Sequence, residues 1–173
     1  YKVFALAPDN KTVALCIANT HAICKDKKKC YEYFEKAIEL PGDNYKAYIC
    51  FAIAKSDFKD YDEAIALYKK AIEINPKEAN AYILLGNLYS NTKRFDEAIA
   101  EYKNALKINK LDPGIYILIA NVMYMNNEIE RSIYSYRAAV NMRPENDEYK
   151  LVFIQVLEDF VKDYRKDDIV AAF

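Results

Sequence analysis

The sequence predicts an all-α solenoid, in which antiparallel helix pairs are stacked, and three observations on its 173 residues predict it. Small side chains recur along the chain at a constant separation, which equals the distance in sequence from position 18 to position 52. Large side chains recur at the same separation, and we call it the repeat interval. The small residues form three ladders: Ala18, Ala52, Gly86 and Ala120; Cys30, Ala64, Ala98 and Ser132; and Ala37, Ala71, Ala105 and Ala139. The large residues form two more: Phe34, Tyr68, Tyr102 and Tyr136; and Ile17, Phe51, Leu85 and Ile119. A fixed interval of this kind indicates one supersecondary unit repeated along the chain.

The third observation is the helical spacing inside one unit, residues 79–112. Apolar and small residues fall three or four apart in two runs, which places each run on one face of a helix. The runs are Tyr82, Leu85, Gly86 and Tyr89, then Ala98, Tyr102 and Ala105. Residues 91–94 are polar and aperiodic, so they predict a tight turn. Gly86 and Ala98 are small enough to mark the crossing of the two helices.

These residues resemble the tetratricopeptide repeat, whose signature is an aromatic residue, Leu-Gly, Tyr, and then Ala, Tyr and Ala. The match lies in residues 82–89, 95–99 and 102–106. The resemblance implies a right-handed superhelix within a single domain, with complete units at 11–44, 45–78, 79–112 and 113–146. We expect residues 1–10 to end a preceding partial repeat. Residues 147–173 are expected to form a C-terminal capping helix, ending near residue 165, and a tail.

Charge and hydropathy argue against several classes of partner. The 25 Lys and Arg residues against 26 Asp and Glu give a net charge of -1, which offers no electrostatic case for nucleic acid. No stretch approaches the roughly 18 apolar residues of a membrane-spanning helix, so no membrane insertion is expected. The four cysteines are expected to be reduced and buried, packing as small hydrophobes. Reduced thiols favour a cytoplasmic location.

Catalysis and metal binding find little support in the residue pattern. His21 is the single histidine, and we expect it to pack between helices. His21 and Cys24 could offer two ligands from one helical face, but a closed zinc site needs a second pair, and none is spaced to match. No phosphate-binding loop, nucleophile elbow or metalloprotease motif occurs. The sequence therefore predicts a protein that is not an enzyme and that uses no cofactor or metal.

The resemblance implies that the functional site is a concave groove lined by the first helix of each pair. Side chains there that face away from the partner helix are expected to contact a ligand. The expected groove residues are Leu15, Cys16, Asn19, Ile49, Cys50, Ile53, Ile83, Leu84, Asn87, Asn91, Ile117, Leu118, Asn121, Tyr124 and Met125. Most are apolar, and Asn19, Asn87 and Asn121 occupy equivalent positions.

The equivalent asparagines leave two interpretations open. An exposed amide both donates to and accepts from a peptide backbone, so the three side chains could hold an extended peptide. They could equally belong to the repeat's own structure. We expect the amides to be exposed when the groove is empty, and both interpretations stay open at this point.

The sequence thus predicts a protein–protein interaction scaffold that binds a peptide or an amphipathic helix in this groove. Two alternatives remain open at this point. The chain could self-assemble as a homo-oligomer through its end repeats, or it could be a recruiting or regulatory segment of a larger enzyme.

Overall fold

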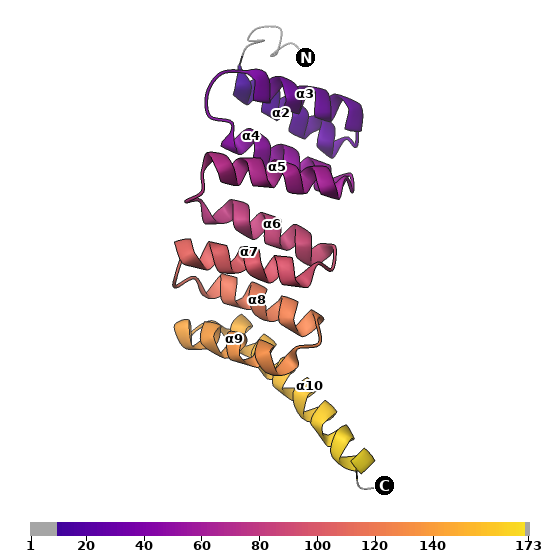
Figure 1. Ribbon diagram of the computed structural model, residues 1–173, viewed down its shortest axis with the longest axis vertical. Helices are drawn as coiled ribbons and strands as arrows, with labels where there is room; N and C mark the ends of the chain where they lie inside the picture. The colour runs from indigo at the N-terminus through magenta and orange to yellow at the C-terminus, as the bar shows by residue number, and fades with distance from the viewer. Residues whose placement is uncertain (1–9, 172–173) are drawn as a thin grey trace. The chain divides into compact units, whose positions relative to one another are not determined.

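The computed structural model describes the backbone of residues 10–171 and the side chains of residues 10–162. Within that part the protein is an all-α helical-repeat solenoid, which confirms the predicted fold class (Figure 1). The helices are α2 (Lys11–Ile23), α3 (Lys27–Glu39), α4 (Tyr45–Asp57), α5 (Tyr61–Ile74), α6 (Ala79–Asn91), α7 (Phe95–Ile108), α8 (Pro113–Met125), α9 (Ile129–Met142) and α10 (Asp147–Ala171). The predicted end of a preceding repeat, in residues 1–10, lies almost wholly outside the described residues.

The helices keep the repeat interval of the sequence. First helices begin at residues 11, 45, 79, 113 and 147, and second helices at 27, 61, 95 and 129. Several starts carry side-chain caps: Asn10 accepts a hydrogen bond from the Val13 amide at 3.1 Å, and Asp26 accepts one from the Lys29 amide at 3.2 Å. Such caps satisfy amide groups that the first helical turn leaves unpaired.

The turns within the helix pairs are also alike. Each contains one residue in the left-handed region: Lys25, Lys59, Lys93 and Asn127, with φ of 58°, 66°, 60° and 61°. The following residue returns a backbone hydrogen bond to the helix just ended, as from the Asp60 amide to the Lys55 carbonyl at 2.9 Å. This is the arrangement of a Schellman cap, which reverses the chain sharply. The repeated turn explains why each second helix begins at the same point of its unit.

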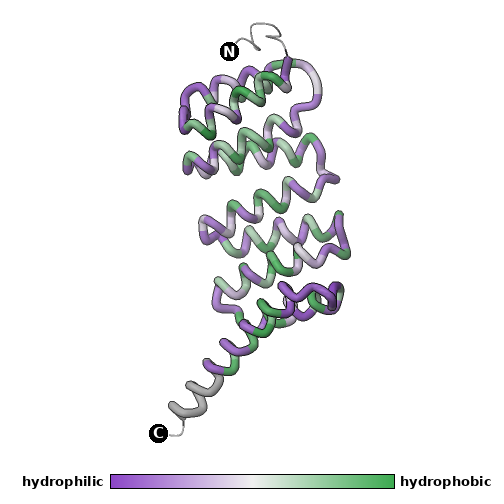
Figure 2. Tube along the Cα trace, turned by 180° about the vertical axis from the view of Figure 1, so that it is seen from behind, coloured by the Kyte–Doolittle hydropathy of each residue, from purple (hydrophilic) through white to green (hydrophobic). Residues whose placement is uncertain are grey.

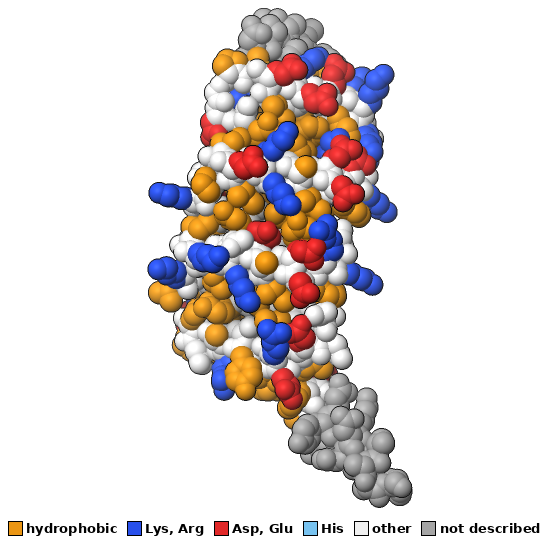
Figure 3. Space-filling model, viewed as in Figure 1, with side chains coloured by type: hydrophobic (Ala, Val, Ile, Leu, Met, Phe, Trp, Pro, Cys, Tyr) orange, Lys and Arg blue, Asp and Glu red, His pale blue; other side chains and the backbone are white. Residues whose placement is uncertain are grey.

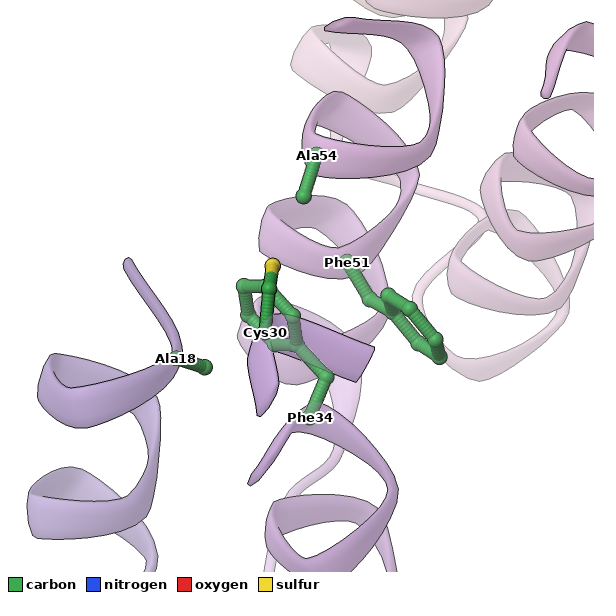
Figure 4. Close-up of a cluster of buried hydrophobic side chains, with 5 residues drawn as sticks. All are labelled: Ala18, Cys30, Phe34, Phe51 and Ala54. Atoms are coloured by element: carbon green, nitrogen blue, oxygen red, sulfur yellow. The ribbon is translucent and has the colours of Figure 1, made fainter. Parts of the chain in front are cut away.

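Two compact units compose the chain, unit 1 ending at Leu88 and unit 2 beginning at Tyr89. In unit 1, α2 packs on α3 and α4 packs on α5, while α4 also contacts α2 and α3. Its core is a cluster of Ala18, Cys30, Phe34, Phe51 and Ala54, drawn in Figure 4. The rings of Phe34 and Phe51 stack with centroids 5.0 Å apart. The small side chains let these helices approach, and the two rings fill the space between them.

In unit 2, α8 packs on α7 and on α9, and α10 packs on α9. Its core contains Ala120, Tyr136 and Val156, with Ile117 and Phe153 packed against them. In Figure 2, hydrophobic and hydrophilic residues alternate along the coloured part of α10. Among the described helices, none combines the length and apolar composition that crossing a lipid bilayer requires.

The last helix is longer than expected. It runs from Asp147 to Ala171, whereas the sequence predicted an end near residue 165. No Pro or Gly lies between residues 147 and 173, so nothing in the backbone chemistry stops the helix at the predicted point.

Candidate partner-binding surfaces

The expected groove residues lie on α2, α4 and α6 and on α8, and all of them except Ile49 keep part of their side chain exposed. Ile49 is only 7% exposed, so the expectation that its side chain lines the groove was wrong. The division of the chain places these residues in two sets. We call those on α2 and α4 the unit 1 inner surface and those on α8 the unit 2 inner surface. Ile83, Leu84 and Asn87 on α6 are half-buried, and Asn91 at its end is exposed.

On the unit 1 inner surface, contacts between α2 and α4 bring Asn19 and Cys50 together. Burial raises the pKa of the Cys50 thiol, and a hydrogen bond from the Asn19 amide acts in the opposite direction. Leu15 and Cys50 pack in part against the core cluster of unit 1. These two side chains therefore support the fold as well as lining the surface. Ile53, 39% exposed, is the large apolar side chain that this surface leaves open.

On the unit 2 inner surface, Asn121 is half-buried, so the expectation of exposed amides was wrong for this residue. Its side-chain oxygen accepts a hydrogen bond from the hydroxyl of Tyr136 on α9. Tyr136 is 2% exposed, and burial raises the pKa of its phenol to about 12, so the hydroxyl remains protonated and needs an acceptor. Asn121 therefore has a structural role, and what it can offer a partner is chiefly the two N–H groups of the amide.

Other residues of the unit 2 inner surface contact α10 or pack against the core. The Tyr124 hydroxyl donates a hydrogen bond to Asp159 at 2.8 Å, and this bond is the main reason that the pKa of Asp159 lies below its usual value. Ile117 packs against the core of unit 2 together with Phe153. Met125 is 53% exposed, more than Ile53 or Tyr124.

The sequence analysis missed part of this surface. Three residues on α10 continue the series of α8: Leu151, Val152 and Gln155 stand one repeat interval after Ile117, Leu118 and Asn121. All three are exposed, Leu151 at 67% and Val152 at 36%. The signal was the repeat interval itself, which places α10 as the first helix of a further unit. We include these three residues in the unit 2 inner surface.

A cluster of polar side chains on α3, on α4 and around the start of α5 is paired internally. Asp60 accepts hydrogen bonds from Lys27 at 2.8 Å and from the Tyr31 hydroxyl at 2.6 Å, and these contacts lower its pKa. The buried Lys55 pairs with Glu63 and lies over the Tyr31 ring, 3.6 Å from its centroid. Such a network fastens neighbouring elements, and its pairing argues for a structural role.

The histidine and the cysteines were predicted only in part. The His21 ring stacks on Tyr33 with centroids 5.8 Å apart, and its Nδ1 lies 3.4 Å from Asp26. Cys30 is buried and Cys50 half-buried, but Cys16 and Cys24 are exposed, so the expectation of four buried cysteines was wrong. In the described part of the chain, no three His, Cys, Asp or Glu side chains are grouped to hold a metal ion.

The face of the molecule drawn in Figure 3 carries basic and acidic side chains interspersed with hydrophobic ones. Mixed charge of this kind does not create the one-sign field that attracts a polyanion. The surface chemistry of interest is therefore the apolar and amide character of the two inner surfaces.

Comparison with known proteins gives matches in family and in fold. Models described as "Tetratricopeptide repeat" match residues 17–44 and residues 57–122. No curated protein matches the sequence. A crystal structure of MamA is similar with a TM-score of 0.71 and 22% identity, covering 86% of each chain. The crystal structure of YrrB, described as "a TPR protein with an unusual peptide-binding site", is similar with a TM-score of 0.68 and 15% identity, covering 87% of this chain and 78% of that one. At these identities the structural likeness shows the fold alone.

Proposed function

Because the chain belongs to the tetratricopeptide repeat family, we propose that it is a non-enzymatic interaction scaffold that holds a peptide or an amphipathic helix on its inner surfaces. The observation that carries the proposal is the exposure of large apolar side chains on the first helices of both units, Ile53 on α4 and Met125 on α8. Within unit 2, Leu151 and Val152 on α10 add exposed apolar side chains to the inner surface that carries Met125, and exposed apolar surface of this kind is typical of a binding site. YrrB, a structural neighbour, is described as having a peptide-binding site, which supports the same role here.

The proposed units 11–44, 45–78, 79–112 and 113–146 each supply one first helix, and α10 supplies a fifth. On the unit 2 inner surface, Met125, Leu151 and Val152 would take apolar side chains of the ligand. Asn121 would donate to a ligand carbonyl, since its oxygen already accepts from Tyr136. The chemistry favours a ligand segment with apolar side chains and accessible backbone carbonyl groups.

The test is selection of peptides from a random-sequence display library on the full chain, followed by affinity measurement for the selected peptides. Ile53→Lys and Met125→Lys place a charge on an inner surface, and each is expected to weaken binding at least tenfold. Burial of one large apolar side chain contributes about 1.5–3 kcal/mol, and a tenfold change in affinity is about 1.4 kcal/mol.

Matched controls are available on the second helices. Ile74 on α5 is 45% exposed and Tyr134 on α9 is 64% exposed, so Ile74→Lys and Tyr134→Lys make comparable changes away from the inner surfaces. We expect these variants to bind as the unaltered chain does. If the controls lose affinity and the inner variants do not, the ligand lies elsewhere and the proposal is wrong.

A further inference from the structure

Helix α10 carries a second apolar face, which adjoins its part of the inner surface. Ile154 is 51% exposed and Val161 is 47% exposed. With Leu157, Glu158 and Lys162 they line an open hollow of about 380 Å³. Residues 154, 157 and 161 are spaced three and four apart, so they form one stripe along the helix. We call this stripe with its two flanking charges the outer face of α10.

The repeat shows what covers this face on other first helices. One repeat interval before Ile154 and Leu157 stand Ala120 and Met123 on α8, which are 0% and 6% exposed. Helix α9 covers them: Tyr136 packs on Ala120, and the Ser135 hydroxyl lies 3.9 Å from the Met123 sulfur. In unit 1 the equivalent residues of α4, Ala52 and Lys55, are buried as well. Each of these faces belongs to a first helix that packs on a second, antiparallel helix.

On α10 that place is open within the described residues. By the repeat interval, a second helix would begin at residue 163, just as α9 begins at residue 129 and α7 at residue 95. The chain instead continues as α10 to Ala171. We propose that an amphipathic helix of a partner protein docks on the outer face of α10, antiparallel to it, in the place that α9 takes on α8.

The side chains define the chemistry of this partner. Ile154 is large where α8 has Ala120, so the partner helix needs a small residue where α9 carries Tyr136. In the antiparallel orientation its first turn lies near Glu158, whose negative charge favours a helix N-terminus and a basic side chain there. The partner is therefore an amphipathic helix with a small residue at its centre and a basic residue in its first turn.

Glu158 disfavours a two-fold symmetric pairing of α10 with α10 of a second copy. When two α10 helices pair antiparallel with Ile154 facing Val161, the two-fold axis passes between residues 157 and 158. The two Glu158 carboxylates then lie next to each other, and like charges at such close range are destabilising. A helix from another protein, with a basic residue opposite Glu158, meets no such repulsion.

The probe for this proposal is a fluorescent stapled peptide with the sequence of α9, Ile129–Met142, carrying Tyr136→Ala. It keeps Arg131 in the first turn and leaves room for Ile154. Fluorescence anisotropy with the full chain measures binding. We expect Ile154→Lys, Val161→Lys and Glu158→Lys each to weaken binding at least tenfold. Because these side chains are exposed, the variants should fold, and circular dichroism verifies this.

Leu111→Lys is the matched control, since Leu111 is an exposed apolar residue of unit 2 outside α10, and it should leave binding unchanged. The proposal is overturned if the peptide does not bind, or if Leu111→Lys weakens binding as much as Ile154→Lys does. It is also overturned if sedimentation reveals a dimer that Val161→Lys dissociates, because a second copy would then occupy the face. Ile154 and Val161 do not belong to the inner surfaces, and the α9 peptide is a different probe from the library-selected peptides, so the proposed function is tested separately.

Discussion

The side chain of Asn121 joins α8 to α9 through the buried hydroxyl of Tyr136. A phenol that is 2% exposed has almost no access to water, so its hydroxyl depends on a partner inside the protein. Any ligand contact at Asn121 is thus built on a residue that the fold already uses.

This contact predicts the effect of Asn121→Ala. The substitution leaves the Tyr136 hydroxyl buried without an acceptor and should lower the free energy of unfolding by about 1–3 kcal/mol. In a double-mutant cycle with Tyr136→Phe, the double variant should be less destabilised than the sum of the single variants. Urea unfolding measures all four proteins. An Asn121→Ala protein as stable as the unaltered chain would show that the hydrogen bond contributes nothing.

At this scale the sequence could indicate where Asn121 lies but not what it contacts. The repeat interval places Asn19, Asn87 and Asn121 at equivalent positions. Whether an amide faces solvent depends on the residue opposite, and the position of the facing helix is a tertiary property that spacing does not contain. Ile49 shows the same limit, since it shares its repeat position with Leu15 and yet is 7% exposed.

At the scale of the helices, small residues at buried positions control how closely elements approach. Every residue of the ladder Cys30, Ala64, Ala98 and Ser132 is 0% exposed. These positions have no room for a larger side chain, and overpacking forces helices apart.

Helix α7 offers a direct test of this packing. Ala98→Leu introduces a large side chain at a buried position and should reduce the free energy of unfolding by about 1–3 kcal/mol. Ala100→Leu makes the same chemical change at an exposed position of the same helix and should alter it by less than about 0.5 kcal/mol. Thermal or urea unfolding distinguishes the two. Equal effects of the two variants would mean that Ala98 does not lie at a close helix contact.

The hydrogen bond between α8 and α10 predicts a pH dependence. Since the folded-state pKa of Asp159 lies below its usual value of 3.8, the ionised carboxylate stabilises the fold. This contribution is complete above the usual pKa and is lost as the pH falls through the lower folded-state value. The stability difference between the unaltered chain and Asp159→Asn should therefore be largest near neutral pH and should shrink in acid. Urea unfolding at several pH values measures it, and a difference that grows in acid would contradict the assignment.

The sequence predicted the helices better than their ends. Apolar spacing located each first and second helix, because burial of one face imposes that spacing. It did not reveal the left-handed Lys25, Lys59 and Lys93, since lysine has no special preference for that conformation. The end of α10 was not predicted correctly either. Residues 163–171 contain neither the apolar pattern of the earlier units nor a helix breaker, so the sequence does not indicate whether the helix continues.

At the scale of the whole molecule, the repeat interval connects composition to function. It predicts the fold because one helix pair leaves apolar surface that only a neighbouring pair can cover. The inner surfaces follow from the same geometry, because the residues of successive first helices that face away from their partner helices remain partly exposed. Under the proposed function, side chains on those surfaces select the ligand, so the interval alone could not identify it.

The most direct test of the account is methyl NMR of the full chain, titrated with a peptide selected from the display library. The account predicts that the methyl resonances of Ile53 on α4 and Met125 on α8 shift on binding, while those of the exposed Ile74 and Met142 on the second helices stay in place. Shifts confined to Ile74 and Met142, with Ile53 and Met125 unchanged, would contradict binding at the inner surfaces.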